Sequence, residues 1–75
     1  MKVSTRADFL VEVVRFRQLF GSRDFMKGPA ETRDAAVSGL GHLYLNAEGI
    51  TSKDGELFAM TMDEYARRLT MLGET

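Results

Sequence analysis

The sequence predicts an all-α protein, a small three-helix bundle that forms a single helical domain over residues 1–75. Three stretches of the chain carry apolar residues at spacings of three and four, which places those residues on one face of a helix. Short segments containing glycine or proline separate the stretches, and helices joined by short loops pack as antiparallel neighbours. The hydrophobic content of 44% and charged content of 28% are those of a folded globular protein.

The first predicted helix covers residues 5–20. Its regular apolar seam consists of Phe9, Val13, Phe16 and Phe20. Ser4 or Thr5 is expected to cap the helix start, and Gly21 is expected to end it in the left-handed conformation. Further apolar residues widen the face beyond that seam: Ala7, Leu10, Val11 and Val14. This face is broader than a pair of neighbouring helices needs, which indicates additional cover, within the chain or from another one.

The second predicted helix begins at Pro29, whose missing N–H suits a first helical turn. Its apolar arc consists of Ala36, Val37, Leu40, Leu43, Tyr44 and Ala47. Gly49 followed by Ile50 is expected to end it. Gly39 and Gly41 each cost about 1 kcal/mol inside a helix, so the alternative is a helix ending near residue 38 followed by a strand over residues 42–46. The regular arc favours the helix.

The third predicted helix ends the chain, and its seam consists of Phe58, Met62, Tyr65, Leu69 and Leu72. Two starts compete: a cap at Ser52, or a capping box over residues 61–64. Asp54-Gly55 is also typical of a tight hairpin, which would make the fold α+β. The long helix is favoured because Phe58 belongs to the seam. In the loop over residues 21–28, Phe25 and Met26 are expected to close one end of the core.

Composition excludes several classes of site. The chain has no cysteine and one histidine, so neither a disulfide nor a structural zinc site is expected, and no cofactor is indicated. No apolar run approaches the ~20 residues that cross a bilayer, and the first residues lack the apolar core of a secretory signal. We therefore expect a cytoplasmic protein that does not associate with a membrane.

The sequence contains no recognisable set of catalytic residues. His42 is expected to project from the helix face opposite the core, where a lone histidine is ordinarily a polar surface residue. The adjacent Asp63 and Glu64 diverge on a helix, and Glu12 can pair with Arg15 three residues later. Gly39-Leu40-Gly41 lacks the third glycine and the preceding strand of a nucleotide-binding loop. The sequence predicts that the protein is not an enzyme.

The charge is uneven along the chain. Seven basic and four acidic residues lie up to residue 33, a net of +3, whereas three basic and seven acidic residues follow, a net of −4. The candidate nucleic-acid contacts are Arg15, Arg23, Lys27 and Arg33. Residues 15 and 17 point about 200° apart on a helix, and the sequence pI is about 5.7, so a DNA- or RNA-binding regulator is the alternative rather than the favoured function.

Excess apolar surface is the feature of the sequence that favours a protein-binding function. Five methionines in a short chain suit adaptable contacts with a partner or gap-filling in the core. The residues expected at a partner or dimer interface are Leu10, Val11, Val14, Gly39 and Leu45. The leading hypothesis is a protein-binding module that forms a homodimer and acts as a regulator, adaptor or inhibitor of a larger protein. Small proteins without motifs are often encoded by phages or plasmids, which suggests such an origin on size alone.

Overall fold

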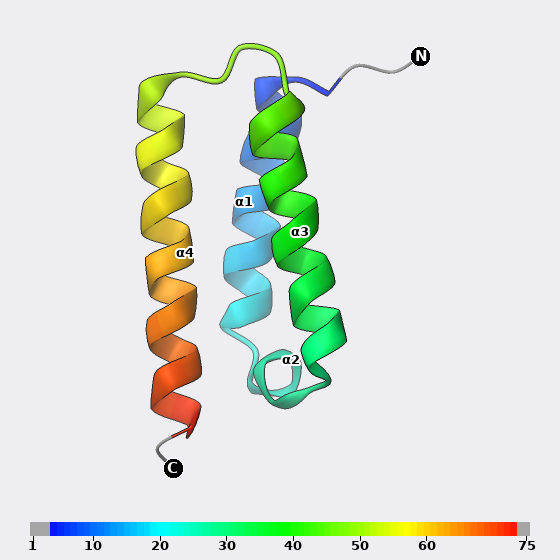
Figure 1. Ribbon diagram of the computed structural model, residues 1–75, viewed down its shortest axis with the longest axis vertical. Coiled ribbons are helices and arrows are strands. Elements are labelled where there is room, and N and C mark those ends of the chain that lie inside the picture. The colour runs from blue at the N-terminus through cyan, green and yellow to red at the C-terminus, as the bar shows by residue number, and fades with distance from the viewer. Residues whose placement is uncertain (1–3, 74–75) are drawn as a thin grey trace.

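The structure is a computed structural model that describes residues 4–73. The helices of that range are α1 (Arg6–Phe20), α2 (Arg23–Lys27), α3 (Ala30–Asn46) and α4 (Ser52–Gly73). The three long helices lie side by side, with α3 running opposite to α1 and α4, and α2 is a short helix in the loop between α1 and α3 (Figure 1). The predicted all-α three-helix bundle is confirmed, and α2 is the addition.

The alternative hairpin around Asp54-Gly55 is wrong, because both residues lie in the first turns of α4. Thr51, rather than Ser52, is the capping residue. The Thr51 hydroxyl oxygen accepts a hydrogen bond from the Asp54 N–H at 3.2 Å, and the Thr51 N–H donates to the Asp54 carboxylate at 3.0 Å. Each group satisfies an amide that the start of a helix would otherwise leave unpaired.

The competing start of the third helix, a capping box over residues 61–64, is also wrong, and the favoured long helix is confirmed. Thr61 lies inside α4, where its hydroxyl donates to the Leu57 carbonyl at 2.7 Å. At the start of α1 the expected cap is confirmed, since Thr5 occupies that position and its N–H donates to the Asp8 carboxylate at 2.9 Å. Gly21 has a φ of −77°, so the left-handed ending predicted for α1 is wrong.

The second predicted helix is confirmed as α3, which continues through Gly39 and Gly41 to Asn46. The alternative strand over residues 42–46 is therefore wrong. Pro29 immediately precedes the first helical residue, and Gly49 adopts the left-handed conformation with a φ of 85°. A residue with a side chain would be strained at that position, which is why glycine suits the turn from α3 to α4.

Near the start of α1, three helices supply an aromatic cluster. Phe9 of α1 is completely buried, and its ring centroid lies 5.8 Å from that of Tyr44 and 6.5 Å from that of Phe58. The Tyr44 and Phe58 rings stack in parallel at 4.6 Å, which joins α3 to α4. Aromatic pairs at these separations stabilise a core beyond the area they bury.

A second aromatic cluster lies nearer the end of α1. Phe16 packs edge-on against Phe20 at 5.4 Å, and the Tyr65 ring of α4 lies 5.2 Å from Phe16. Met26 of α2 is buried and Phe25 is half-buried, so these two residues close that end of the core as predicted. α1 thus supplies aromatic side chains to both clusters.

An ion pair joins the beginnings of α1 and α4. The Arg6 guanidinium donates from Nε to Asp54 Oδ2 at 2.7 Å and from Nη2 to Oδ1 at 3.1 Å, and the Asp54 side chain is almost fully buried. The Arg6 backbone N–H donates to the Glu48 carbonyl at 2.8 Å, and the Glu48 N–H donates to the Ser4 carbonyl at 2.9 Å. The start of α1 is therefore held to both the α3–α4 turn and α4.

The helical position of Gly55 allows a test of the aromatic cluster. A Cβ at Gly55 would lie 2.9 Å from the Tyr44 hydroxyl oxygen, whereas nothing lies within 4 Å of a Cβ at Gly39. We expect Gly39→Ala to stabilise the fold by about 1 kcal/mol, the ordinary gain of alanine over glycine in a helix. We expect Gly55→Ala to lose that gain or destabilise the fold, because the Tyr44 ring is stacked on Phe58 and resists displacement.

Urea unfolding of the two variants measures this difference, and Tyr44→Phe in the Gly55→Ala background provides the rescue. Removing the hydroxyl removes the obstacle at 2.9 Å, so the double variant should recover the stability of Tyr44→Phe alone or exceed it. Equal gains from alanine at residues 39 and 55 would contradict the close contact with Tyr44.

The ion pair predicts a pH dependence of stability. The hydrogen bonds from Arg6, followed by the one from the Thr51 N–H, hold the pKa of Asp54 below its ordinary value. A carboxylate whose pKa is lower in the folded state contributes stability that is complete above the unfolded pKa of about 3.9 and is lost as the pH falls through the folded pKa. We expect Asp54→Asn to lower the melting temperature by several degrees at pH 7, and the difference from the wild type to shrink as the pH falls below the ordinary pKa of the carboxyl group. In the exposed Glu56→Gln control, the wild-type pH profile should persist.

Candidate protein-binding face

The side of α1 turned away from the core carries no charge. We call it the outer face of α1, and it consists of Ala7, Val11, Val14 and Gln18. The spacings of four, three and four residues repeat those of the buried seam on the opposite side of the same helix. The side chains of Val11 and Val14 are 58% and 56% exposed, so the structure leaves apolar surface in the middle of this face.

The fold leaves this face open because α3 and α4 both pack against the buried seam of α1. On the α4 side, the Arg17 guanidinium donates to the Glu64 carboxylate at 3.1 Å and marks one edge of the outer face. Leu10 lies on that same edge, where it is half-buried against the core. The outer face lies beyond this edge, about 180° around the helix from the Phe9 seam.

The other edge of the outer face is charged. Asp8, Glu12 and Arg15 follow it, and the Arg15 guanidinium lies 3.4 Å from the Glu12 carboxylate, the pairing expected from their spacing. This ion pair is exposed to solvent, so it contributes little to stability. It does keep both acidic and basic groups at the border of the apolar surface, where a partner would meet them.

The structure brings together only part of the predicted interface. Val11 and Val14 share the outer face and Leu10 lies at its edge, but Gly39 and Leu45 belong to α3. Six residues apart on one helix, Gly39 and Leu45 point about 120° away from each other. Leu45 is 78% exposed, and the position of a Cβ at Gly39 has no neighbour within 4 Å. The outer face of α1 is thus the part of the prediction that forms a coherent surface.

The predicted nucleic-acid contacts lie on three different helices. Arg15 lies in the middle of α1 beside Glu12, whereas Arg23 and Lys27 are exposed on α2. Arg33 is half-buried and donates to the carbonyl oxygens of residues 26 and 28, the first at 3.0 Å. This last contact has a structural purpose, because it satisfies carbonyl groups at the end of a helix.

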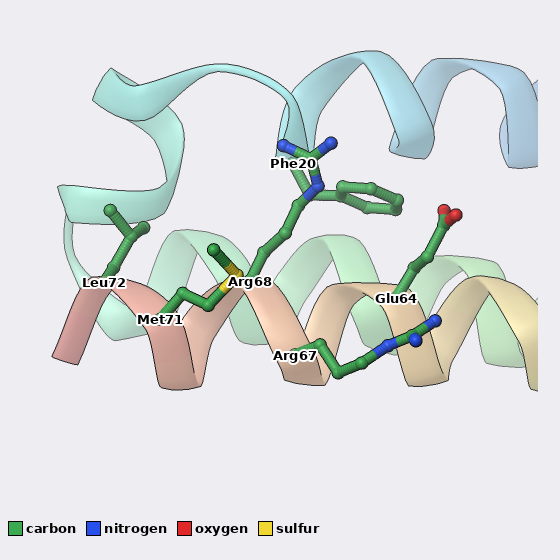
Figure 2. Close-up of a pocket in the computed structure, with 6 residues that line it drawn as sticks. All are labelled: Phe20, Glu64, Arg67, Arg68, Met71 and Leu72. Carbon is green, nitrogen blue, oxygen red and sulfur yellow. The ribbon is translucent and has the colours of Figure 1, made fainter. Parts of the chain in front are cut away.

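A groove that was not predicted from the sequence lies between the end of α1 and α4. It encloses about 540 Å³ and is lined by Phe20, Glu64, Arg67, Arg68, Met71 and Leu72. The Arg68 guanidinium carbon lies 5.5 Å from the Phe20 ring centroid, whereas Arg67 extends away from Phe20 along the far side of α4 (Figure 2). No sequence motif marks this groove, because it depends on which residues of α4 come to lie beside residue 20.

Two described side chains that could perform chemistry have ordinary partners. Glu64 in the groove pairs with Arg17, and the exposed His42 has the Asn46 side-chain amide 3.4 Å from its Nδ1. Within residues 4–73, no three His, Cys, Asp or Glu side chains are grouped so that they could hold a metal ion. The same range contains no helix with both the length and the apolarity to cross a membrane.

Comparisons of the chain with protein-family models, with curated proteins and with solved structures find no match.

Substitutions on the two faces of α1 test the division between surface and core. We expect Val11→Glu with Val14→Glu to change the free energy of unfolding by no more than about 0.5 kcal/mol each, because both positions are exposed in a helix that accepts glutamate. Val13→Glu, which buries a carboxylate in the seam, should destabilise the fold by several kcal/mol or prevent folding. Thermal unfolding followed by circular dichroism measures both effects. Comparable losses from the two faces would show that the outer face is covered within the chain.

Proposed function

We propose that this chain is a protein-binding module that docks on a protein partner through the outer face of α1, and acts as a regulator, adaptor or inhibitor rather than as an enzyme. The observation that carries the proposal is the exposure of Val11 and Val14 at the centre of an uncharged face. This helix already fills the bundle core with its opposite side, so its exposed valines have no further structural use within the bundle.

The binding free energy available from the two valines determines how large the contact with a partner must be. Complete burial of one valine contributes about 1.5 kcal/mol, and the two valines on the outer face are already partly covered. The loss of translational and rotational freedom on association costs more than these two residues contribute. A partner must therefore also contact the flanking groups, among which Leu10 adds apolar area and Arg15 adds charge.

Rigidity of the face supports a binding role. α1 is held by Phe9, Val13 and Phe16 in the core and by the Arg6 ion pair at its start. Docking on a helix whose backbone is already ordered requires little further loss of conformational entropy. Two carboxylates support the same interpretation, because Asp54 and Glu64 are engaged in ion pairs that join α1 to α4.

Site-specific photo-crosslinking tests the proposal in cells that naturally produce the protein. We expect a photoreactive amino acid in place of Val11 to give a crosslinked product with a protein. The same group in place of Leu45, which is more exposed but lies on α3, should give little or none. Mass spectrometry of the product identifies the partner. No product from residue 11, or equal products from residues 11 and 45, would contradict docking through the outer face.

A further inference from the structure

We infer that the partner of the outer face of α1 is the same face of a second copy of this chain, with the two α1 helices antiparallel. The inference rests on the proposed function, since it names the occupant of the proposed docking face. It is carried by two features of α1: the spacing of the uncharged residues and the order of the charges along one edge.

The spacing fits a helix pair. Ala7, Val11, Val14 and Gln18 recur at four, three and four residues, the pattern that brings side chains of one helix to a continuous seam with another. A twofold axis between residues 11 and 14 makes the seam complementary to itself. Val11 of each copy then meets Val14 of the other at the centre, while Ala7 meets Gln18 towards the ends.

The charged edge selects the antiparallel direction. Along this edge the order is Asp8, Glu12, Arg15, and all three lie in α1. With residue 11 opposite residue 14 of the second copy, Arg15 of the second copy lies level with residue 10. That level is midway between Asp8 and Glu12, so Arg15 of the second copy reaches both carboxylates. The twofold axis gives Arg15 of the first copy the same two partners.

The parallel arrangement offers no such match. It would place the charged edge of one helix against the opposite edge of the other, which carries Leu10 and Arg17. Arg15 would then meet an apolar side chain and approach a second cation. In the antiparallel pair the two Leu10 edges face each other instead. There Leu10 packs beside the aliphatic part of Arg17, whose guanidinium remains paired with Glu64 of its own chain.

The predicted strength follows from the size of the face. A 15-residue helix is about 22 Å long and contributes one narrow seam, which is less than the extensive apolar surface of obligate dimers. The chain also buries its own core without a second copy. We therefore expect a reversible dimer with a dissociation constant in the micromolar range, which separates into folded monomers on dilution.

Charge reversal gives the test. Sedimentation equilibrium is performed on the wild type, on Arg15→Glu, on Glu12→Arg and on an equimolar mixture of the two variants. In a dimer of Arg15→Glu, the new glutamate of each copy lies beside Asp8 and Glu12 of the other copy, so three acidic groups meet. In a dimer of Glu12→Arg, the new arginine lies beside Arg15 of the other copy. Each variant alone should therefore dimerise about tenfold more weakly than the wild type. In the mixture, residue 15 of either chain meets an opposite charge at residue 12 of the other, and heterodimers should form with an affinity near that of the wild type.

Two controls separate loss of docking from loss of fold. Val11→Glu with Val14→Glu should abolish dimerisation while circular dichroism remains that of the wild type, and Leu45→Glu should leave the dissociation constant unchanged. A wild-type chain that remains monomeric at millimolar concentration overturns the inference, and so does a mixture that associates no better than its two components.

The crosslink at residue 11 tests the proposed function independently of dimerisation. A monomeric chain that crosslinks at residue 11 to a different protein overturns self-association but retains a protein-binding face. A monomeric chain without any crosslink at that residue overturns both.

Discussion

One geometric constraint determines the arrangement of this molecule: α1 has two long neighbours, and both pack against the same side of it. Phe9, Val13, Phe16 and Phe20 fill the space between α3 and α4, and Phe9 is completely buried there. Within residues 4–73, no further long helix covers the other side of α1. Apolar residues placed on that other side are exposed in the monomer, which is the origin of the outer face that Val11 and Val14 form.

The contacts that hold α1 in place also define how the outer face is presented. The Arg6 ion pair with Asp54 and the Arg17 ion pair with Glu64 fix α1 alongside α4 at two levels, and the stacked Tyr44 and Phe58 rings close the core between α3 and α4. The carboxylate of the buried pair also caps α4. The outer face is therefore a rigid surface with a defined border of charges, and rigidity favours specific docking over non-specific adhesion.

The long helices were predictable from sequence because their apolar residues recur regularly over many turns, whereas the helix ends were not. Thr51 was missed as the cap of α4 because several neighbouring polar residues could cap a helix. The choice depends on Asp54, which is held by Arg6, 48 residues before it in the chain. Gly55 suggested a turn, but the structure shows that its missing side chain makes room for the Tyr44 hydroxyl. Val11 and Val14 were predicted for the interface from their excess apolarity. The groove beside Phe20 could not be predicted from the sequence, since it depends on the register between α1 and α4.

The central claim, that the outer face of α1 is a docking face for a second copy, is tested most directly by the solvent exposure of individual methyl groups. Nuclear magnetic relaxation of valine and leucine methyls by a paramagnetic probe dissolved in the solvent measures this exposure at low and at high protein concentration. At low concentration the methyls of Val11, Val14 and Leu45 should all relax rapidly, since all three are exposed in the monomer. At high concentration we expect the methyls of Val11 and Val14 to become protected and those of Leu45 to stay exposed. Unchanged relaxation at these two residues, or equal protection of Leu45, would contradict the central claim.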